Sequence, residues 1–118
     1  VLLMEGLELL ESPAELEFWF GRGVRLASLS WNGVTRWGSG TFGDGSGLTA
    51  AGRELLGEFE RCGLILDLSH LAEAGTLEVF QRAEEAGITS VMCAPWFGSD
   101  DVAGSVARFA DEVIIKMR

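Results

Sequence analysis

The sequence has 118 residues, 47% of them hydrophobic, which suits one compact domain with one core and excludes a chain too polar to fold. Nine lysines and arginines against eighteen acidic residues give a net charge of -9, which disfavours binding to nucleic-acid phosphates or to anionic membranes. No apolar run reaches the ~20 residues that a membrane-spanning helix needs.

Two strands and a helix are predicted at the start of the chain. An apolar run over residues 1–4 predicts a strand that ends at Glu5. The sequence Ser12-Pro13-Ala14-Glu15 has the form of a capping box with proline at the first helical position, and the glycines at 21 and 23 end the helix. The buried stripe of that helix consists of Leu16, Trp19 and Phe20. Residues 24–29 predict the second strand.

A glycine-rich segment follows, from Ser30 to Leu48. A connection of this length inside a compact domain is typical of a functional or mobile loop. We interpret its residues 38–43 as a flexible, glycine-rich lid. Residues 38–43 match the dinucleotide-binding spacing G-x-G-x-x-G. They do not open a helix directly after a strand, as phosphate binding requires, so we interpret the match as chance.

Two helices and a strand are predicted after the loop. The first helix begins near Thr49 and ends at Cys62-Gly63. Its buried residues are Leu55, Leu56 and Phe59. Residues 64–68 predict the most hydrophobic strand, a nearly continuous apolar run typical of a strand covered on both faces. The second helix, over 74–86, is predicted to bury Leu77, Phe80 and Ala83.

A strand over 88–93 and a helix opened by Ser99, Asp100 and Asp101 complete the pattern. Strict alternation of strand and helix predicts an α/β fold with a parallel sheet. Four consecutive βα units make half of a TIM-type (βα)8 barrel, and the alternative is a small open sheet wrapped by helices. We expect one domain over 1–118, a partial barrel.

Three candidates for chemistry lie at or just past the carboxyl ends of the predicted strands, the edge at which parallel α/β folds build their sites. These are Glu5, the pair Trp31-Asn32, and His70, the only histidine. The alternatives are that Glu5 caps the following turn, that Trp31 and Asn32 pack a loop, and that His70 is a hydrogen-bonded structural residue.

Several common catalytic patterns are excluded. Asp67, Ser69 and His70 have the residue types of a serine-hydrolase triad, but strand neighbours point to opposite faces and cannot line up. The sequence contains no HExxH, no Walker loop and no cysteine pair at zinc spacing.

Four segments, taken in order, carry a resemblance to a known family. They are Met4-Glu5-Gly6; Gly23-Val24-Arg25 with Leu29-Ser30-Trp31-Asn32; Gly47-Leu48-Thr49 with Gly52-Arg53-Glu54-Leu55; and Leu66-Asp67-Leu68-Ser69-His70-Leu71. Over about residues 3–83 the chain resembles the membrane (renal) dipeptidases, zinc metallopeptidases of the amidohydrolase-like barrel superfamily.

The resemblance implies hydrolysis of a dipeptide by a zinc-bound hydroxide. It implies that Glu5 bridges two zinc ions, that His70 contacts the substrate near the reacting centre, and that the loop from Gly38 to Gly47 lies over the mouth of the site. The family's His-x-Asp motif, its two later zinc histidines and its later aspartate are absent, and a zinc ion needs three or four protein ligands. We therefore expect a dipeptidase fragment that holds no zinc pair and is inactive alone.

The tail carries a second resemblance and two further hypotheses. Residues 84–118, and most clearly 85–117, resemble the closing strand and helix of luciferase-like monooxygenases, which implies an oxidoreductase with a flavin or deazaflavin cofactor. The third hypothesis is a non-catalytic half-barrel scaffold, whose two open strand edges favour a homodimer. No secretory signal is visible and two cysteines suit a reducing compartment, so we expect a soluble, cytoplasmic protein.

Overall fold

The computed structural model describes residues 1–87, 101, 103–104, 107 and 111. The chain forms two compact units, Val1–Gly87 and Ile88–Arg118. The first unit alternates strand and helix as predicted, in the order β1 (Leu2–Met4), α1 (Glu15–Gly21), β2 (Val24–Ser28), α2 (Ala50–Cys62), β3 (Ile65–Asp67) and α3 (Glu73–Glu85). In residues 1–87 and the few described beyond them, no helix has the length and apolar character to cross a membrane.

The last predicted unit falls mostly outside the described residues. The strand expected over 88–93 is one such part, so the fourth βα unit and the single domain over 1–118 stay predictions. Residues 103, 104 and 107 are helical, as expected for the last helix. Asp101 Oδ1 accepts a hydrogen bond from Gly104 N at 2.8 Å, which confirms that this aspartate supplies an acceptor at the start of the helix.

The three strands form one parallel sheet in the order β1-β2-β3, which confirms the α/β class. Leu3, Leu26 and Ile65 are register partners across the sheet, and the next row is Met4, Ala27 and Leu66. Successive residues of a strand point to opposite faces, so these two rows belong to opposite faces of the sheet.

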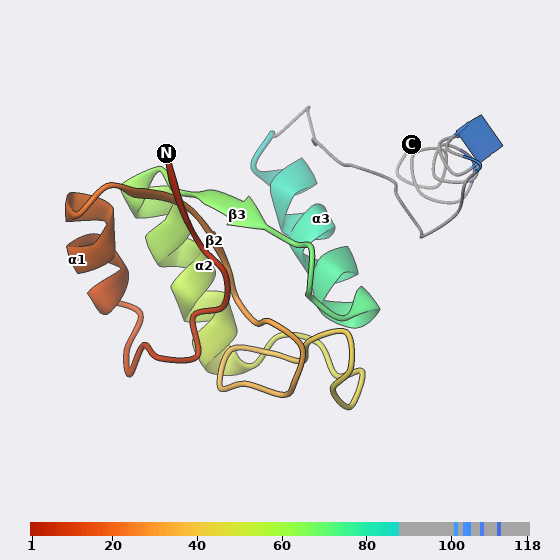
Figure 1. The fold of residues 1–118 in the computed structure, drawn as a ribbon, viewed down its shortest axis with the longest axis horizontal. Coiled ribbons are helices and arrows are strands. Elements are labelled where there is room, and N and C mark those ends of the chain that lie inside the picture. The colour runs from red at the N-terminus through yellow and green to blue at the C-terminus, as the bar shows by residue number, and fades with distance from the viewer. Residues whose placement is uncertain (88–100, 102, 105–106, 108–110, 112–118) are drawn as a thin grey trace. The chain divides into compact units, whose positions relative to one another are not determined.

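The face that carries Ala27 packs against α1 and α2 (Figure 1). The residues fully buried there are Leu16 of α1, Ala27 of β2 and Leu55 of α2. Helix α2 begins as predicted, because the Thr49 side chain accepts a hydrogen bond from Gly52 N at 3.0 Å. It ends at Gly63, whose positive φ of 70° favours glycine.

The opposite face of the sheet is largely open, which corrects one prediction. Ile65 of β3 is 59% exposed and Leu3 of β1 is 52% exposed. The strand predicted to be covered on both faces is therefore covered on one. The physical reason is that α1 and α2 pack on the face that carries Ala27, which leaves the Ile65 side chain exposed on the opposite face.

The predicted capping box of α1 forms only in part. Glu15 Oε1 accepts from Ser12 N at 3.1 Å, as a capping box requires. The reciprocal bond is absent because Glu15 N donates to the Ser12 carbonyl instead, at 3.2 Å. The helix therefore begins at Glu15 with Ala14 as its N-cap, and Pro13 precedes it rather than occupying its first position.

The buried face of α3 also differs from the prediction. Leu77 is exposed, Phe80 is half-buried, and the contact with the core is made by Gly75 and Val79. Gly75 packs closely on Leu71, since a Cβ at this glycine would lie 3.0 Å from Leu71 Cγ. The helix thus approaches through its smallest residue, and this turns Leu77 outward.

An ion pair links the two longer helices. The Arg53 guanidinium of α2 donates Nε and Nη2 hydrogen bonds to the Glu78 carboxylate of α3. These hydrogen bonds, and the charge of Glu78, raise the pKa of Arg53. Both groups are partly exposed to solvent, so the pair orients α3 more than it stabilises the fold.

The glycine-rich segment is packed into the unit over residues 37–40, whereas residues 41–46 are exposed and the flexible lid stays a prediction. Trp37 is 1% exposed and its Nε1 donates to the Leu7 carbonyl at 2.7 Å. Ser39 is fully buried, and its carbonyl accepts from Ala72 N at 2.9 Å. In Figure 1 this segment runs in orange and yellow between α2 and the start of α3.

Candidate functional site

Two of the residues singled out in the sequence meet at the carboxyl edge of the sheet. Glu5 follows β1 and His70 follows β3, so they reach this edge from the two outer strands of the described sheet. His70 Nε2 lies 2.8 Å from Glu5 Oε1. The contact is a hydrogen bond in which the imidazole donates when its Nε2 carries the proton. The edge thus brings together a carboxylate and an imidazole separated by 65 residues of sequence.

Trp31 joins this pair from the central strand. It follows β2, and its ring meets the His70 ring edge-on, with centroids 6.4 Å apart and planes at 66°. Its backbone N donates to Glu8 Oε1 at 2.7 Å. Asn32 contributes its carbonyl, which accepts from Phe42 N at 2.9 Å. The prediction that these three places in the sequence share one edge is confirmed.

The His70 backbone is fixed by the glycine-rich segment. Thr41 donates two hydrogen bonds to the His70 carbonyl, from its N at 2.8 Å and from Oγ1 at 3.1 Å. Gly40 forms an antiparallel bridge with Leu71, the next residue. The roles of Thr41 and Glu8 were missed in the sequence, because neither lies at a fixed spacing from the residue that it holds.

The serine-hydrolase arrangement is absent among the described residues, as predicted. The Asp67 carboxylate accepts from Ser69 N at 3.0 Å and from the Ser69 hydroxyl, forming a local turn after β3. His70 pairs with Glu5 instead. The G-x-G-x-x-G match is likewise chance, since 38–43 runs into a turn and α2 begins only at Ala50.

Ser30 has a buried hydroxyl that has no hydrogen-bond partner among the described residues. An unsatisfied buried polar group costs about 1–3 kcal/mol, so we expect Ser30→Ala to raise the free energy of unfolding by about 1 kcal/mol in urea titrations. Ser28→Ala is the matched control, because the Ser28 hydroxyl accepts from Gly6 N at 2.7 Å. It should destabilise the protein. If both substitutions changed the free energy of unfolding in the same direction, this interpretation of the Ser30 hydroxyl would be wrong.

Comparison with known families shows to which protein family the chain is related. Residues 1–92 match the membrane dipeptidase family, peptidase family M19. The chain belongs to the membrane dipeptidase family. The match covers every described helix and strand of the first unit and extends past residue 83, where the resemblance noted in the sequence stops. No curated protein matches the chain.

Membership of the membrane dipeptidases makes this chain part of a family of hydrolases that are metallopeptidases and act on peptides. It also associates the parallel sheet with a TIM-like barrel. The comparisons give no support to a flavin- or deazaflavin-dependent oxidoreductase. The luciferase-like resemblance of the tail remains a prediction beyond residue 92.

The zinc chemistry of membrane dipeptidases provides a test of fit for this site. Zinc takes three or four protein ligands in most protein sites. In the described part of the chain, no three histidine, cysteine or acidic side chains gather closely enough to hold a metal ion. Glu5 and His70 provide two groups, already bonded to each other. The described residues therefore do not fit a zinc pair by themselves.

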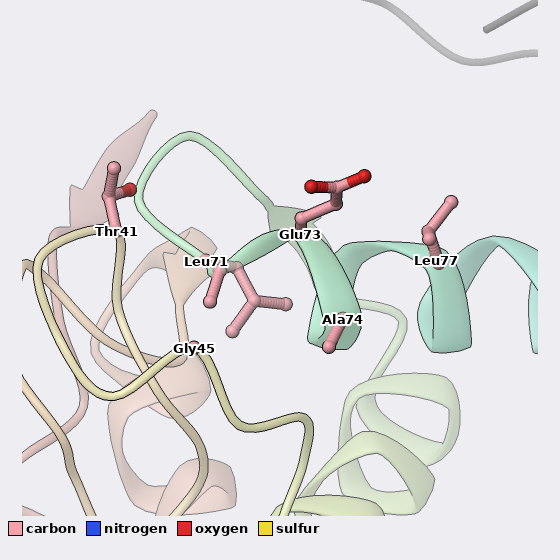
Figure 2. Close-up of a pocket in the computed structure, with 7 residues that line it drawn as sticks. Thr41, Gly45, Leu71, Glu73, Ala74 and Leu77 are labelled. Carbon is pink, nitrogen blue, oxygen red and sulfur yellow. The ribbon is translucent and has the colours of Figure 1, made fainter.

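A pocket of about 520 Å³ lies between the glycine-rich segment and the beginning of α3. Figure 2 shows Thr41 and Gly45 of the glycine-rich segment on one side and Leu71, Ala74 and Leu77 of the α3 start on the other. Glu5, Trp31 and His70 do not line it. Its volume falls within the range of small-molecule sites, but its described lining carries one charged residue, Glu73, whose carboxylate points away from Leu71 (Figure 2).

Proposed function

We propose that the edge formed by Glu5 and His70 is part of a zinc-dependent dipeptidase site. In this proposal Glu5 is a metal ligand and His70 contacts the dipeptide. The observation that carries it is the 2.8 Å contact between the two side chains, at the carboxyl edge of a parallel sheet, in a chain of the membrane dipeptidase family. The remaining metal ligands come from outside the described residues.

The exposure of the pair supports a functional role. The Glu5 side chain is 53% exposed and that of His70 is 28% exposed. An exposed pair of this kind contributes little to stability, so stability alone does not explain its presence. Both side chains can be reached by a small ligand from solvent.

His70 can then act through the proton on Nε2. An imidazole N–H is a suitable donor to a peptide carbonyl oxygen on which negative charge develops. The backbone bonds from Thr41 hold the imidazole at this edge before any substrate binds. A dipeptide carbonyl would compete with Glu5 for this donor, so metal binding by Glu5 and substrate binding by His70 go together in this proposal.

The proposal includes the fold. The three described units, with a fourth over 88–118, would make half of a TIM-type barrel. The row of Leu3, Leu26 and Ile65, in which Leu26 is half-buried and the other two are exposed, supports this, because inward-facing residues of barrel strands are apolar and are covered when the barrel closes.

Hydrolysis of dipeptides by a zinc-loaded assembly that contains this chain tests the proposed function. We expect hydrolysis, and a loss of tenfold or more in kcat/KM for both Glu5→Gln and His70→Ala, since each removes a group at the reacting centre. Glu11→Gln, at an exposed acidic residue of the same unit, is the matched control. An assembly that cleaves no dipeptide, or two variants with unchanged activity, would overturn the proposal.

Native mass spectrometry of the isolated chain in excess zinc checks the incomplete ligand set. We expect no zinc pair per chain, because the described residues gather no group of three metal ligands. Two retained zinc ions per chain would contradict this interpretation. The same spectra show whether the open apolar face leads to a homodimer, as predicted from the sequence.

A further inference from the structure

Trp31 stands out among the exposed hydrophobic residues by its fixed position. Exposure alone does not distinguish it, because Leu9 and Phe42 are more exposed. Trp31, at 53% exposed, is held by its backbone N on Glu8 Oε1 and has its ring against His70. None of the expected family roles falls on this residue.

The backbone beside Trp31 is held just as closely. Gly40 N donates to the Gly33 carbonyl at 2.7 Å and Phe42 N donates to the Asn32 carbonyl at 2.9 Å. Gly40 approaches so closely that a Cβ there would lie 2.6 Å from the Asn32 carbonyl carbon. These are main-chain contacts, so they persist when the Trp31 side chain is replaced.

The two rings form a corner at the candidate site. Their planes meet at 66°, so the indole and the imidazole present differently oriented surfaces beside the Glu5 carboxylate. An indole face is a large, rigid apolar surface. The corner thus combines polar groups suited to a peptide backbone with an apolar wall suited to a side chain.

The charge of this corner orients a dipeptide. The carboxylates of Glu5 and Glu8 both lie here, one on His70 and the other on the Trp31 backbone. Because Glu5 is a metal ligand in the proposed function, the Glu8 carboxylate is the charge left here to favour the ammonium end of a dipeptide and to disfavour an acidic side chain. The first residue of the dipeptide is therefore the one whose side chain lies nearest the indole.

We propose that Trp31 is a specificity-determining residue that selects dipeptides with an apolar amino-terminal side chain. The proposal rests on the proposed function and extends it to the substrate class. An apolar side chain that packs on the indole face is removed from water, which favours binding. Glycine has no side chain to bury there.

The single histidine provides the readout, because the His70 imidazole gives one set of ring signals in NMR spectra. The probes are Leu-Gly, Gly-Leu and Gly-Gly, titrated into the purified chain. We expect Leu-Gly to bind about tenfold more tightly than Gly-Gly, the affinity ratio that burial of one aliphatic side chain supplies. Gly-Leu should resemble Gly-Gly.

Three variants test the residue. Trp31→Ala should bring the Leu-Gly to Gly-Gly ratio close to one, and Trp31→Phe should retain part of the preference. Phe18→Ala is the matched control, since Phe18 is an aromatic residue of α1 with the same exposure, 52%. It should keep the full ratio.

The outcomes separate the two proposals. A preference for Leu-Gly that survives in Trp31→Ala overturns the role of Trp31, and so does the absence of any preference. A Gly-Leu preference that depends on Trp31 overturns the assignment to the amino-terminal residue. The proposed function fails separately, in the hydrolysis assay, if the zinc-loaded assembly cleaves none of the three probes.

Discussion

Trp37→Ala is expected to lower the free energy of unfolding by about 3–5 kcal/mol, the usual cost of removing a large buried aromatic side chain. Trp37 is 1% exposed, and its indole N–H donates to the Leu7 carbonyl. Removing it leaves a cavity beneath the glycine-rich segment and an unpaired carbonyl. Chemical denaturation followed by circular dichroism measures the change.

Two substitutions separate the causes. Trp37→Phe keeps most of the volume and loses the hydrogen bond, so it should cost about 1–2 kcal/mol. Trp31→Ala, in the same segment but at an exposed position, should stay within about 0.5 kcal/mol of the unmodified protein. If Trp37→Ala were no more destabilising than Trp31→Ala, the segment would not belong to the core.

Gly52→Ala is expected to destabilise the protein by about 3 kcal/mol, at the upper end of the cost of overpacking. Alanine is the better helix former, so an exposed glycine of α2 would gain stability from the same change. At Gly52, however, a Cβ would overlap the Trp37 carbonyl oxygen, which also accepts from Thr49 N. Sterics therefore outweigh helix propensity here.

Gly57 provides the control within the same helix. A Cβ at Gly57 meets no atom within 4 Å, so Gly57→Ala should stabilise the protein by about 0.5–1 kcal/mol. Thermal and urea unfolding of both variants should give opposite signs. The same sign at both positions would show that the close approach of α2 to Trp37 does not limit the residue at position 52.

The elements with strong local signals were predicted well from the sequence. Thr49 and Gly63 mark the ends of α2 by side-chain capping and by a positive φ, and both are local properties. The strand edge with Glu5 and His70 was also predicted, because the carboxyl ends of parallel strands lie together. The dipeptidase family was recognised from short segments that span these same elements.

The failures concern contacts between distant parts of the chain. Nothing near Trp37 in the sequence shows that its indole reaches Leu7, so the packing of residues 37–40 was not predicted. The open face of β3 depends on which face of the sheet the helices cover, which its apolar sequence does not reveal. The outward position of Leu77 follows from the close packing of Gly75 on Leu71. Each is a tertiary effect that overrides a local pattern.

The order β1-β2-β3 has a consequence for how the protein forms during synthesis. Each strand pairs with the strand made just before it, so the sheet can grow one unit at a time as the chain emerges from the ribosome. Glu5 is synthesised with the first unit, and His70, 65 residues later in the sequence, is synthesised with the third. The sheet can thus form strand by strand, whereas the contact between the Glu5 carboxylate and the His70 imidazole forms only when the third unit folds.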